Sequence, residues 1–331
     1  MRMKRLFLLV LVAAGLAPGT FVRSEVPPKD YTAPVMVTKL EVKRLRAHGP
    51  LVLEDAWLLS SRNANFGGYS ALVARSPTRF LAASDAGRLL HIERPDLSDE
   101  PPRIETFLAS RMVDKMSVDV ESLTIDPATG ELWAGLEWGQ EIMALGARLE
   151  RRETVKPDAM KDWASNAGPE SLVRLADGRF IAIEEYELAD GQHRALLFPS
   201  DPVGGAKPLR FVLQGRDGYR PSDAALLPDG RIAVLLRGFV LGLPPRFPSM
   251  IVIADPSRIE PDQLLPSTVL ARLEEPLPSD NFEGLAVVEE AEDVWDFWVI
   301  SDDNFASHQH TLLLRLRWDR RTDHARQKAR E

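Results

Sequence analysis

The sequence predicts an all-β protein, a β-propeller of five or six blades. A short motif, in which a polar or acidic residue precedes an apolar stretch, recurs five times along the chain. Its motif residues are 51, 49, 53 and 60 residues apart: Ser70, Glu121, Glu170, Asp223 and Glu283. No helical periodicity of comparable strength is present. Repeats of about 50 residues built from short strands are typical of propeller blades packed around a central channel.

Composition indicates a globular protein and limits its partners. The 331 residues are 44% hydrophobic, with 41 Lys and Arg against 49 Asp and Glu, for a formal charge of -8. A nucleic-acid partner is disfavoured, because phosphate backbones are bound by basic surfaces. Cysteine is absent, which excludes disulfides, thiolate metal sites and a cysteine nucleophile.

The N-terminus carries the three-part pattern of a secretory signal peptide over residues 1–17. Arg2, Lys4 and Arg5 precede an apolar run at 6–14, and small residues follow. A core helix is the alternative interpretation. We expect export to the periplasm or the medium, and no later stretch approaches the ~20 apolar residues of a membrane span. An extended leader is expected at 18–34, one propeller domain at 35–318 and a charged tail at 319–331.

Within each repeat, two apolar strands flank a turn that contains Asp and Gly, as at Asp177-Gly178 and Asp229-Gly230. Such turns favour hairpins, because Gly accepts positive φ and Asp bonds its own backbone. Second strands are predicted at 80–84, 131–136, 179–184, 231–236 and 296–301, and third strands at 89–92, 141–145, 195–198, 250–254 and 311–316. Strands at 40–45 and 51–59 would complete the last blade or form most of a sixth. Pairing of the N- and C-terminal strands would close the ring and remove sheet edges.

A second polar position ends each second strand, and it predicts a funnel at one mouth of the propeller. These residues are Asp85, Glu137, Glu184, Arg237 and Asp302. The end of a second strand and the start of a first strand lie at the same end of a meander, so both sets should converge. Crowded carboxylates need a cation, and calcium tolerates irregular oxygen ligands. Strand-end capping is the alternative role.

The densest polar cluster joins Asp280-Asn281-Phe282-Glu283-Gly284 with Ser301-Asp302-Asp303-Asn304-Phe305 and His308-Gln309-His310-Thr311. It could bind a metal or supply a general acid and base. Both histidines could instead lie on an exposed loop. Trp138 and Trp163, near the proposed mouth, could stack on a ring-shaped ligand. Local signatures of serine hydrolases, zincins, Walker loops and dinucleotide-binding loops are absent from the sequence.

At these residues the chain resembles the exported bacterial phytase-like proteins, also described as "esterase-like activity of phytase". The resemblance rests on Asp119-Val120-Glu121-Ser122-Leu123, Asn166-Ala167-Gly168-Pro169-Glu170-Ser171-Leu172, and the paired final motifs Asp280–Leu285 and Ser301–Phe305. It implies a secreted propeller that hydrolyses phosphate or carboxylic esters. A polyphosphorylated substrate would need several basic groups, and the funnel offers mainly Arg237.

The leading hypothesis is a metal-assisted hydrolase of a small ester or phosphoester. Calcium would be held by Glu121, Glu170, Asp223, Glu283, Asp302, Asp303 and Asp85. Glu283 or Glu170 would position water, and Arg237 would hold an anionic group. Substrate contacts are expected from Asn166, Asn281, Asn304, His308 and Gln309. The competing hypothesis is a non-catalytic propeller that binds a ligand or partner at the same mouth.

Overall fold

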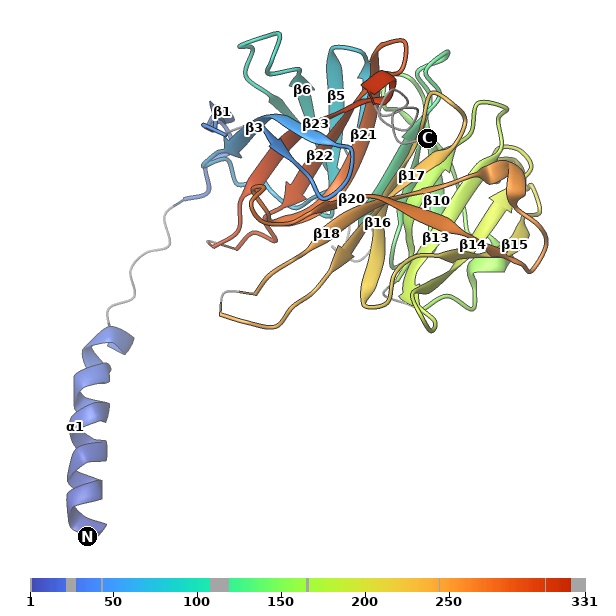
Figure 1. The fold of residues 1–331 in the computed structure, drawn as a ribbon. Helices are drawn as coiled ribbons and strands as arrows, with labels where there is room; N and C mark the ends of the chain where they lie inside the picture. Colours follow the sequence, from blue (N-terminus) through green and yellow to red (C-terminus); the bar gives the residue numbers. More distant parts are fainter. Residues whose placement is uncertain are drawn as a thin grey trace.

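The computed structural model contains five sheets arranged as the blades of a propeller, antiparallel except for one short parallel pair at 212–213 and 264–265 (Figure 1). It describes residues 2–21, 28–42, 44–107, 119–164, 167–243, 245–306 and 308–322. The predicted fold class is therefore confirmed, with five blades rather than six. Helix α1 (Arg2–Phe21) precedes the propeller and extends four residues past the predicted signal peptide. Among the described residues, no helix is long and apolar enough to cross a membrane.

In four blades the strands follow chain order from the channel outward, except that residues 264–265 join blade 3 from the segment that forms blade 4. Blade 1 contains β4 (Tyr69–Ser76), β5 (Arg79–Ser84), β6 (Arg88–Glu93) and β7 (Arg103–Thr106). Blade 2 contains β8 (Val120–Ile125), β9 (Leu132–Leu136), β10 (Glu141–Leu145) and β11 (Arg151–Val155). Blade 3 contains β12 (Pro169–Arg174), β13 (Phe180–Glu187), β14 (Gln192–Phe198), β15 (Leu209–Gln214) and β19 (Leu264–Leu265). Blade 4 contains β16 (Tyr219–Leu226), β17 (Ile232–Gly238), β18 (Ser249–Ala254) and β20 (Ser267–Leu273).

Blade 5 joins the two ends of the propeller domain, as the sequence predicted. It contains β21 (Asn281–Ala291), β22 (Val294–Asp302) and β23 (Thr311–Asp319), with β1 (Met36–Lys39), β2 (Leu45–Arg46) and β3 (Val52–Ser60). Strand β3 pairs antiparallel with β23, and in Figure 1 the blue strand lies beside the red one. This pairing closes the ring, so the domain exposes fewer free sheet edges.

The N-terminal segment differs from the single strand predicted at 40–45. Lys39 of β1 lies opposite Trp57, and Leu45 of β2 lies opposite Leu53. The chain advances six residues from Lys39 to Leu45, but their partners on β3 are only four residues apart. The ladder cannot stay in register across such a mismatch, so residues 40–42 and 44 belong to neither strand.

The apolar core lies mainly between neighbouring blades. Between blades 5 and 1, Trp57 stacks on Trp298 with ring centroids 5.5 Å apart, and Phe80 packs on the same indole at 4.8 Å. Aromatic pairs of this kind contribute about 0.5–1.5 kcal/mol beyond the burial of their area. Blade packing therefore supplies the stability that this cysteine-free chain cannot obtain from disulfides.

The five innermost strands, β4, β8, β12, β16 and β21, contact one another in a ring around the channel. Each carries a β-bulge at the equivalent place, where one extra residue enters the strand opposite a single partner. A bulge re-aims side chains locally while the rest of the strand keeps its alternation. The five extra residues are Ser70, Glu121, Glu170, Ser222 and Glu283.

Asp223, the residue after the bulge of β16, ties three inner strands together. It is fully buried, and its carboxylate accepts the backbone N–H of Leu72 at 3.3 Å and of Leu285 at 2.7 Å. It also accepts the N–H of Ala224 at 2.8 Å. Burial raises the pKa of Asp223 well above its ordinary value, and these three donors oppose the shift. The carboxylate predicted to bind metal is thus used by the backbone of blades 1, 4 and 5.

We expect Asp223→Ala to lower the free energy of unfolding by about 2–4 kcal/mol, because two inter-blade N–H groups would lose their acceptor. Asp223→Asn should lose less, since its amide oxygen can still accept one of them. Urea denaturation measures both, with the exposed Asp99→Ala as reference. Equal stabilities for the Asp223→Ala and Asp99→Ala variants would refute the structural role.

Candidate functional site at the propeller mouth

Strand pairing defines which residues reach the mouth. The residue before each bulge pairs with Ser84, Leu136, Glu184, Leu236 or Ser301 on the second strand. The next residues along the chain form a second ring beside the bulge residues: Asp85, Glu137, Glu185, Arg237 and Asp302. Their offsets from the bulge residues are 15, 16, 15, 15 and 19.

Two positions of the sequence-based repeat are therefore one residue out of register. Blade 4 contributes Ser222 at the bulge in place of Asp223, and blade 3 contributes Glu185 in place of Glu184. The Glu184 carboxylate is buried, accepts the N–H of Ala164 and pairs with Arg194 at 2.9 Å. Its pKa is raised to about 7, because burial outweighs these two partners. Glu184 does not line the funnel, since neighbouring strand residues point to opposite faces.

Carboxylates from blades 2 and 3 form the tightest cluster. Oxygens of Asp119, Glu121 and Glu137 lie within 4.8 Å of one another, and so do oxygens of Glu137, Glu170 and Glu185. Glu170 is only 8% exposed. Within the part of the chain that the structure describes, its carboxylate has neither a hydrogen bond nor an ion pair. An unpaired, nearly buried carboxylate beside other carboxylates is costly unless a cation or proton neutralises it.

Arg237 supplies positive charge to the opposite side of the ring. Its Nη2 lies 3.2 Å from Glu185 Oε1, and its Nη1 lies 2.9 Å from Glu283 Oε1. The same Nη1 donates to Asn281 Oδ1 at 3.0 Å, while the Asn281 amide donates to Glu283 at 2.8 Å. Arg220 reaches the other oxygen of Glu185 at 3.5 Å. Glu283 and Glu185 are therefore held by ion pairs that Glu170 lacks.

The acidic side chains at the mouth have strongly shifted pKa values. Burial first, and the neighbouring carboxylates second, raise the pKa of Glu121 and Glu170 well above the ordinary value. Burial also raises the pKa of Glu283, although Arg237 opposes the shift. The pKa values of Glu137 and Asp302 are raised to about 8, for Glu137 by burial and Asp119, and for Asp302 by burial and Glu283. Such groups can exchange protons near neutral pH.

Two other acidic residues of blade 5 accept hydrogen bonds from backbone N–H groups of nearby loops. Asp303 accepts the N–H of Gly68 at 3.1 Å and of Phe305 at 3.0 Å, and Asp302 accepts that of Asn304 at 2.7 Å. The Asn304 amide donates to Gln309 at 3.3 Å. Asp303 and Asn304, predicted as a metal ligand and a substrate contact, therefore have structural partners in the hairpin between β22 and β23.

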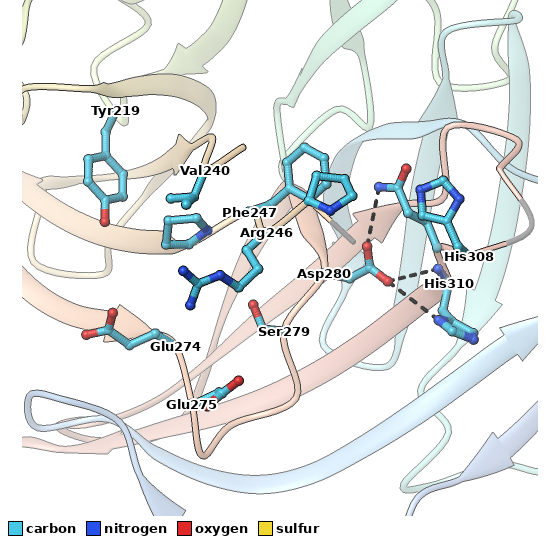
Figure 2. A pocket seen from close by; sticks show the side chains of 13 residues that line it. Tyr219, Val240, Arg246, Phe247, Glu274, Glu275, Ser279, Asp280, His308 and His310 are labelled. Carbon is cyan, nitrogen blue, oxygen red and sulfur yellow. Dashed lines mark hydrogen bonds and ion pairs between the residues drawn. The ribbon is translucent and has the colours of Figure 1, made fainter. Parts of the chain in front are cut away.

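A pocket of about 610 Å³ opens beside the ring, between blades 4 and 5 (Figure 2). His308 and Gln309, two predicted substrate contacts, line it together with Asp280. Asp280 accepts the N–H of His310 at 2.9 Å, and its carboxylate lies 3.6 Å from the His310 ring, as Figure 2 shows. Asp280 directly precedes Asn281, so the pocket adjoins the ion pairs of Arg237.

The remaining predicted residues separate into two groups. Trp163 is buried at 5% exposure, whereas Trp138 is 44% exposed at the mouth. Asp85 follows β5 and raises the pKa of Glu283 and Asp302, which places it in the ring. Asn166 lies outside the described residues. Sequence reasoning missed Asp119 and Glu185, although a uniform offset of about 15 residues between the two rings would have selected Glu185.

A protein-family model described as "Phytase-like: Esterase-like activity of phytase" matches residues 64–305. The match covers both rings and most of the five blades. The chain belongs to the phytase-like family. This membership confirms the resemblance seen in the motifs around Glu121, Glu170 and Glu283. A search of curated proteins finds no match.

Solved structures match this phytase-like protein at low identity and with TM-scores below 0.5. Hydrazine synthase of Kuenenia stuttgartiensis is 13% identical with a TM-score of 0.39, over 73% of this chain and 58% of that one. A nidogen/laminin complex is 7% identical with a TM-score of 0.43, over 80% and 88%. A luciferin-regenerating enzyme is 14% identical with a TM-score of 0.44, over 85% and 95%.

The raised pKa values predict how stability depends on pH in the presence of a chelator. Asp302 has a pKa of about 8 in the folded protein against an ordinary value of 3.8. A raised carboxyl pKa favours folding below pH 4, and this contribution is lost as pH rises through 8. Asp302→Asn removes it while keeping the acceptor for Asn304. The free energy of unfolding of the variant, relative to that of wild type, should therefore rise by a few kcal/mol between pH 5 and pH 8, since one pKa unit corresponds to about 1.4 kcal/mol.

Urea denaturation at several pH values measures this difference. Asp99→Asn, at an exposed site, serves as the control and should follow the wild-type pH profile. A constant difference between Asp302→Asn and wild type from pH 5 to pH 8 would contradict the shifted pKa.

Proposed function

We propose that this phytase-like protein is an exported, calcium-assisted hydrolase of a carboxylic ester or phosphoester. The observation that carries the proposal is Glu170, a nearly buried carboxylate with no hydrogen bond or ion pair to any described residue, next to Glu137 and Glu185. Family membership supports ester hydrolysis as the reaction class. The basic and apolar pattern of residues 1–17 supports export to the periplasm or the medium.

The donor set fits calcium. Two groups of candidate ligands share Glu137, and every ligand atom in them is a carboxylate oxygen, the ligand type of hard cations: Asp119, Glu121 and Glu137, and Glu137, Glu170 and Glu185. Calcium tolerates the irregular spacing of side chains that come from two blades. When bound, the ion would polarise the carbonyl or phosphoryl oxygen of the substrate. Asp223 is not part of this set, because its oxygens serve backbone N–H groups.

The protein's own residues would handle water and protons. Glu283 has a raised pKa and lies beside Arg237 and Asn281, so it would hold the attacking water and accept its proton. The water oxygen then bonds to the ester carbon or phosphorus, the bond to the alcohol oxygen breaks, and the proton passes to the departing alcohol. The positive charge of the Arg237 guanidinium would stabilise negative charge that develops on the substrate.

Calcium should stabilise the protein through Glu170. At free calcium of roughly a hundred times the dissociation constant, binding to the native state alone adds about 2.7 kcal/mol. Glu170→Gln should lose this increment and should be more stable than wild type in chelator, because it removes a nearly buried carboxyl group that pairs with no described residue. The matched control is Glu184→Gln, a buried carboxylate of the same blade that points away from the mouth and should keep the increment. Thermal melts with calcium and with chelator decide, and coincident wild-type melts would contradict calcium binding.

Hydrolysis is tested by turnover of p-nitrophenyl carboxylic esters and p-nitrophenyl phosphate in calcium and in chelator. We expect calcium-dependent turnover that falls by about a hundredfold or more in Glu283→Gln, the scale of losing a general base. The calcium-induced rise in melting temperature should persist in that variant. Calcium binding without turnover of any ester would favour the alternative, a propeller that binds a ligand at its mouth without catalysis.

A further inference from the structure

Glu137 belongs to two groups of carboxylates at the mouth. Oxygens of Glu137, Asp119 and Glu121 lie within 4.8 Å of one another, and oxygens of Glu137, Glu170 and Glu185 do the same. We call these the first and the second carboxylate group. Calcium binds oxygen ligands at about 2.3–2.6 Å, so two ligands of one ion lie at most about 5 Å apart. Each group therefore has the spacing of ligands around a single ion.

One ion cannot contact all five of these carboxylates. In the described parts of the chain, the two groups do not merge into a larger group that meets the same 4.8 Å limit. Glu137 is the shared member, and a carboxylate has two oxygens with about four lone-pair sites between them. It can therefore give an oxygen to an ion on either side. The arrangement thus provides two ion positions that share one ligand.

Glycine at position 168 brings blade 3 close to Glu137. A Cβ on residue 168 would lie 2.5 Å from the Cα of Glu137, a separation that real Cβ atoms do not show. Gly168 directly precedes β12, which carries Glu170 in its bulge, and Glu137 directly follows β9 of blade 2. The close approach of the two backbones therefore lets a side chain of blade 2 meet those of blade 3 in the second carboxylate group.

Glu170 supplies the second carboxylate group with a side chain that bonds to no described residue. It is only 8% exposed, and buried polar groups normally have a hydrogen-bond partner or coordinate a metal. Glu185, in the same group, pairs with Arg237 at 3.2 Å and with Arg220 at 3.5 Å, so its carboxylate is held in place. The second group therefore combines one ligand that is already positioned with one that lacks a partner.

We propose that the mouth binds two calcium ions, one in each carboxylate group, with Glu137 as the bridging ligand. The inference rests on the calcium binding of the proposed function and adds a second ion to it. The ion in the second group would join blade 2 to blade 3 and lie nearer to Arg237, which pairs with both Glu185 and Glu283. That position therefore adjoins the groups proposed to handle substrate and water. Two dications repel each other, so the two ions should bind with different affinities.

Calorimetric titration of the full, chelator-treated chain with calcium counts the ions, and wild type should bind two. Glu170→Gln should lose only the ion of the second group and Glu121→Gln only that of the first, so each variant should bind one. Glu137→Gln should weaken both by about tenfold or more, because calcium affinity depends on the number of charged ligands. Glu184→Gln, whose side chain points away from the mouth, is the control and should bind two. Cooperative thermal melts in chelator show that each variant is folded.

Gly168→Ala tests the shared ligand through the backbone. The added methyl would separate the start of β12 from Glu137, so the ion of the second group should be weakened more than that of the first. Gly204→Ala is the matched control, because the Cβ position of residue 204 has open space around it. Equal calcium affinities for the two alanine variants would overturn the placement of an ion between the blades.

The number of ions distinguishes this inference from the proposed function. A single ion in wild type, lost in both Glu121→Gln and Glu170→Gln, would overturn the second ion and keep the calcium-assisted hydrolase. Two ions that bind unchanged in Glu137→Gln would overturn the bridging ligand. Two ions without turnover of any ester would refute the hydrolase proposal and keep the two-ion site. A wild-type chain that binds no calcium would overturn both.

Discussion

One extra residue in each innermost strand is the constraint on which the site depends. Inner strands must alternate strictly to pack between neighbouring blades, and strict alternation alone would send every second side chain into the apolar core. The bulge adds a position outside that alternation, so Glu121, Glu170 and Glu283 reach the mouth without disturbing the strand below. In blades 1 and 4 the same position holds Ser70 and Ser222, whose hydroxyls donate to the backbone carbonyl of the next inner strand. The bulge position thus either places a carboxylate at the mouth or supplies a hydroxyl that bonds two neighbouring inner strands.

The bulges also explain why the sequence predicts the fold better than the site. Strand order, ring closure and turns follow from period-two patterns and Asp-Gly turns, and small boundary errors leave them intact. Predicting which side chain reaches the mouth needs more precision, because an error of one residue in the register places the side chain on the opposite face. Acidity favours Asp223 over Ser222, and residue type does not distinguish Glu184 from Glu185. In the structure Asp223 accepts backbone N–H groups and Glu184 pairs with Arg194.

Positive and negative charges are distributed unevenly around the mouth. Arg237 pairs with Glu185 and Glu283, while other carboxyl groups are crowded on the side of blades 2 and 3: Asp119, Glu121, Glu137 and Glu170. Burial without compensation destabilises the ionised form, which is why their pKa values rise. The folded protein therefore tolerates unfavourable electrostatics that a cation would relieve. Replacing these groups with neutral residues is therefore expected to raise the stability of the folded protein.

The repeated fold supplies equivalent positions, and differences between blades convert them into distinct roles. Blades 2 and 3 place glutamates in both rings, blade 4 replaces its pair with Ser222 and Arg237, and blade 5 adds a strained loop that carries Phe305. An ester that entered along the channel axis would meet acidic oxygens on one side and a guanidinium on the other. Because Asp223 occupies the channel with a carboxylate bonded to strands of three blades, such a ligand would enter and leave through the mouth that carries the two rings.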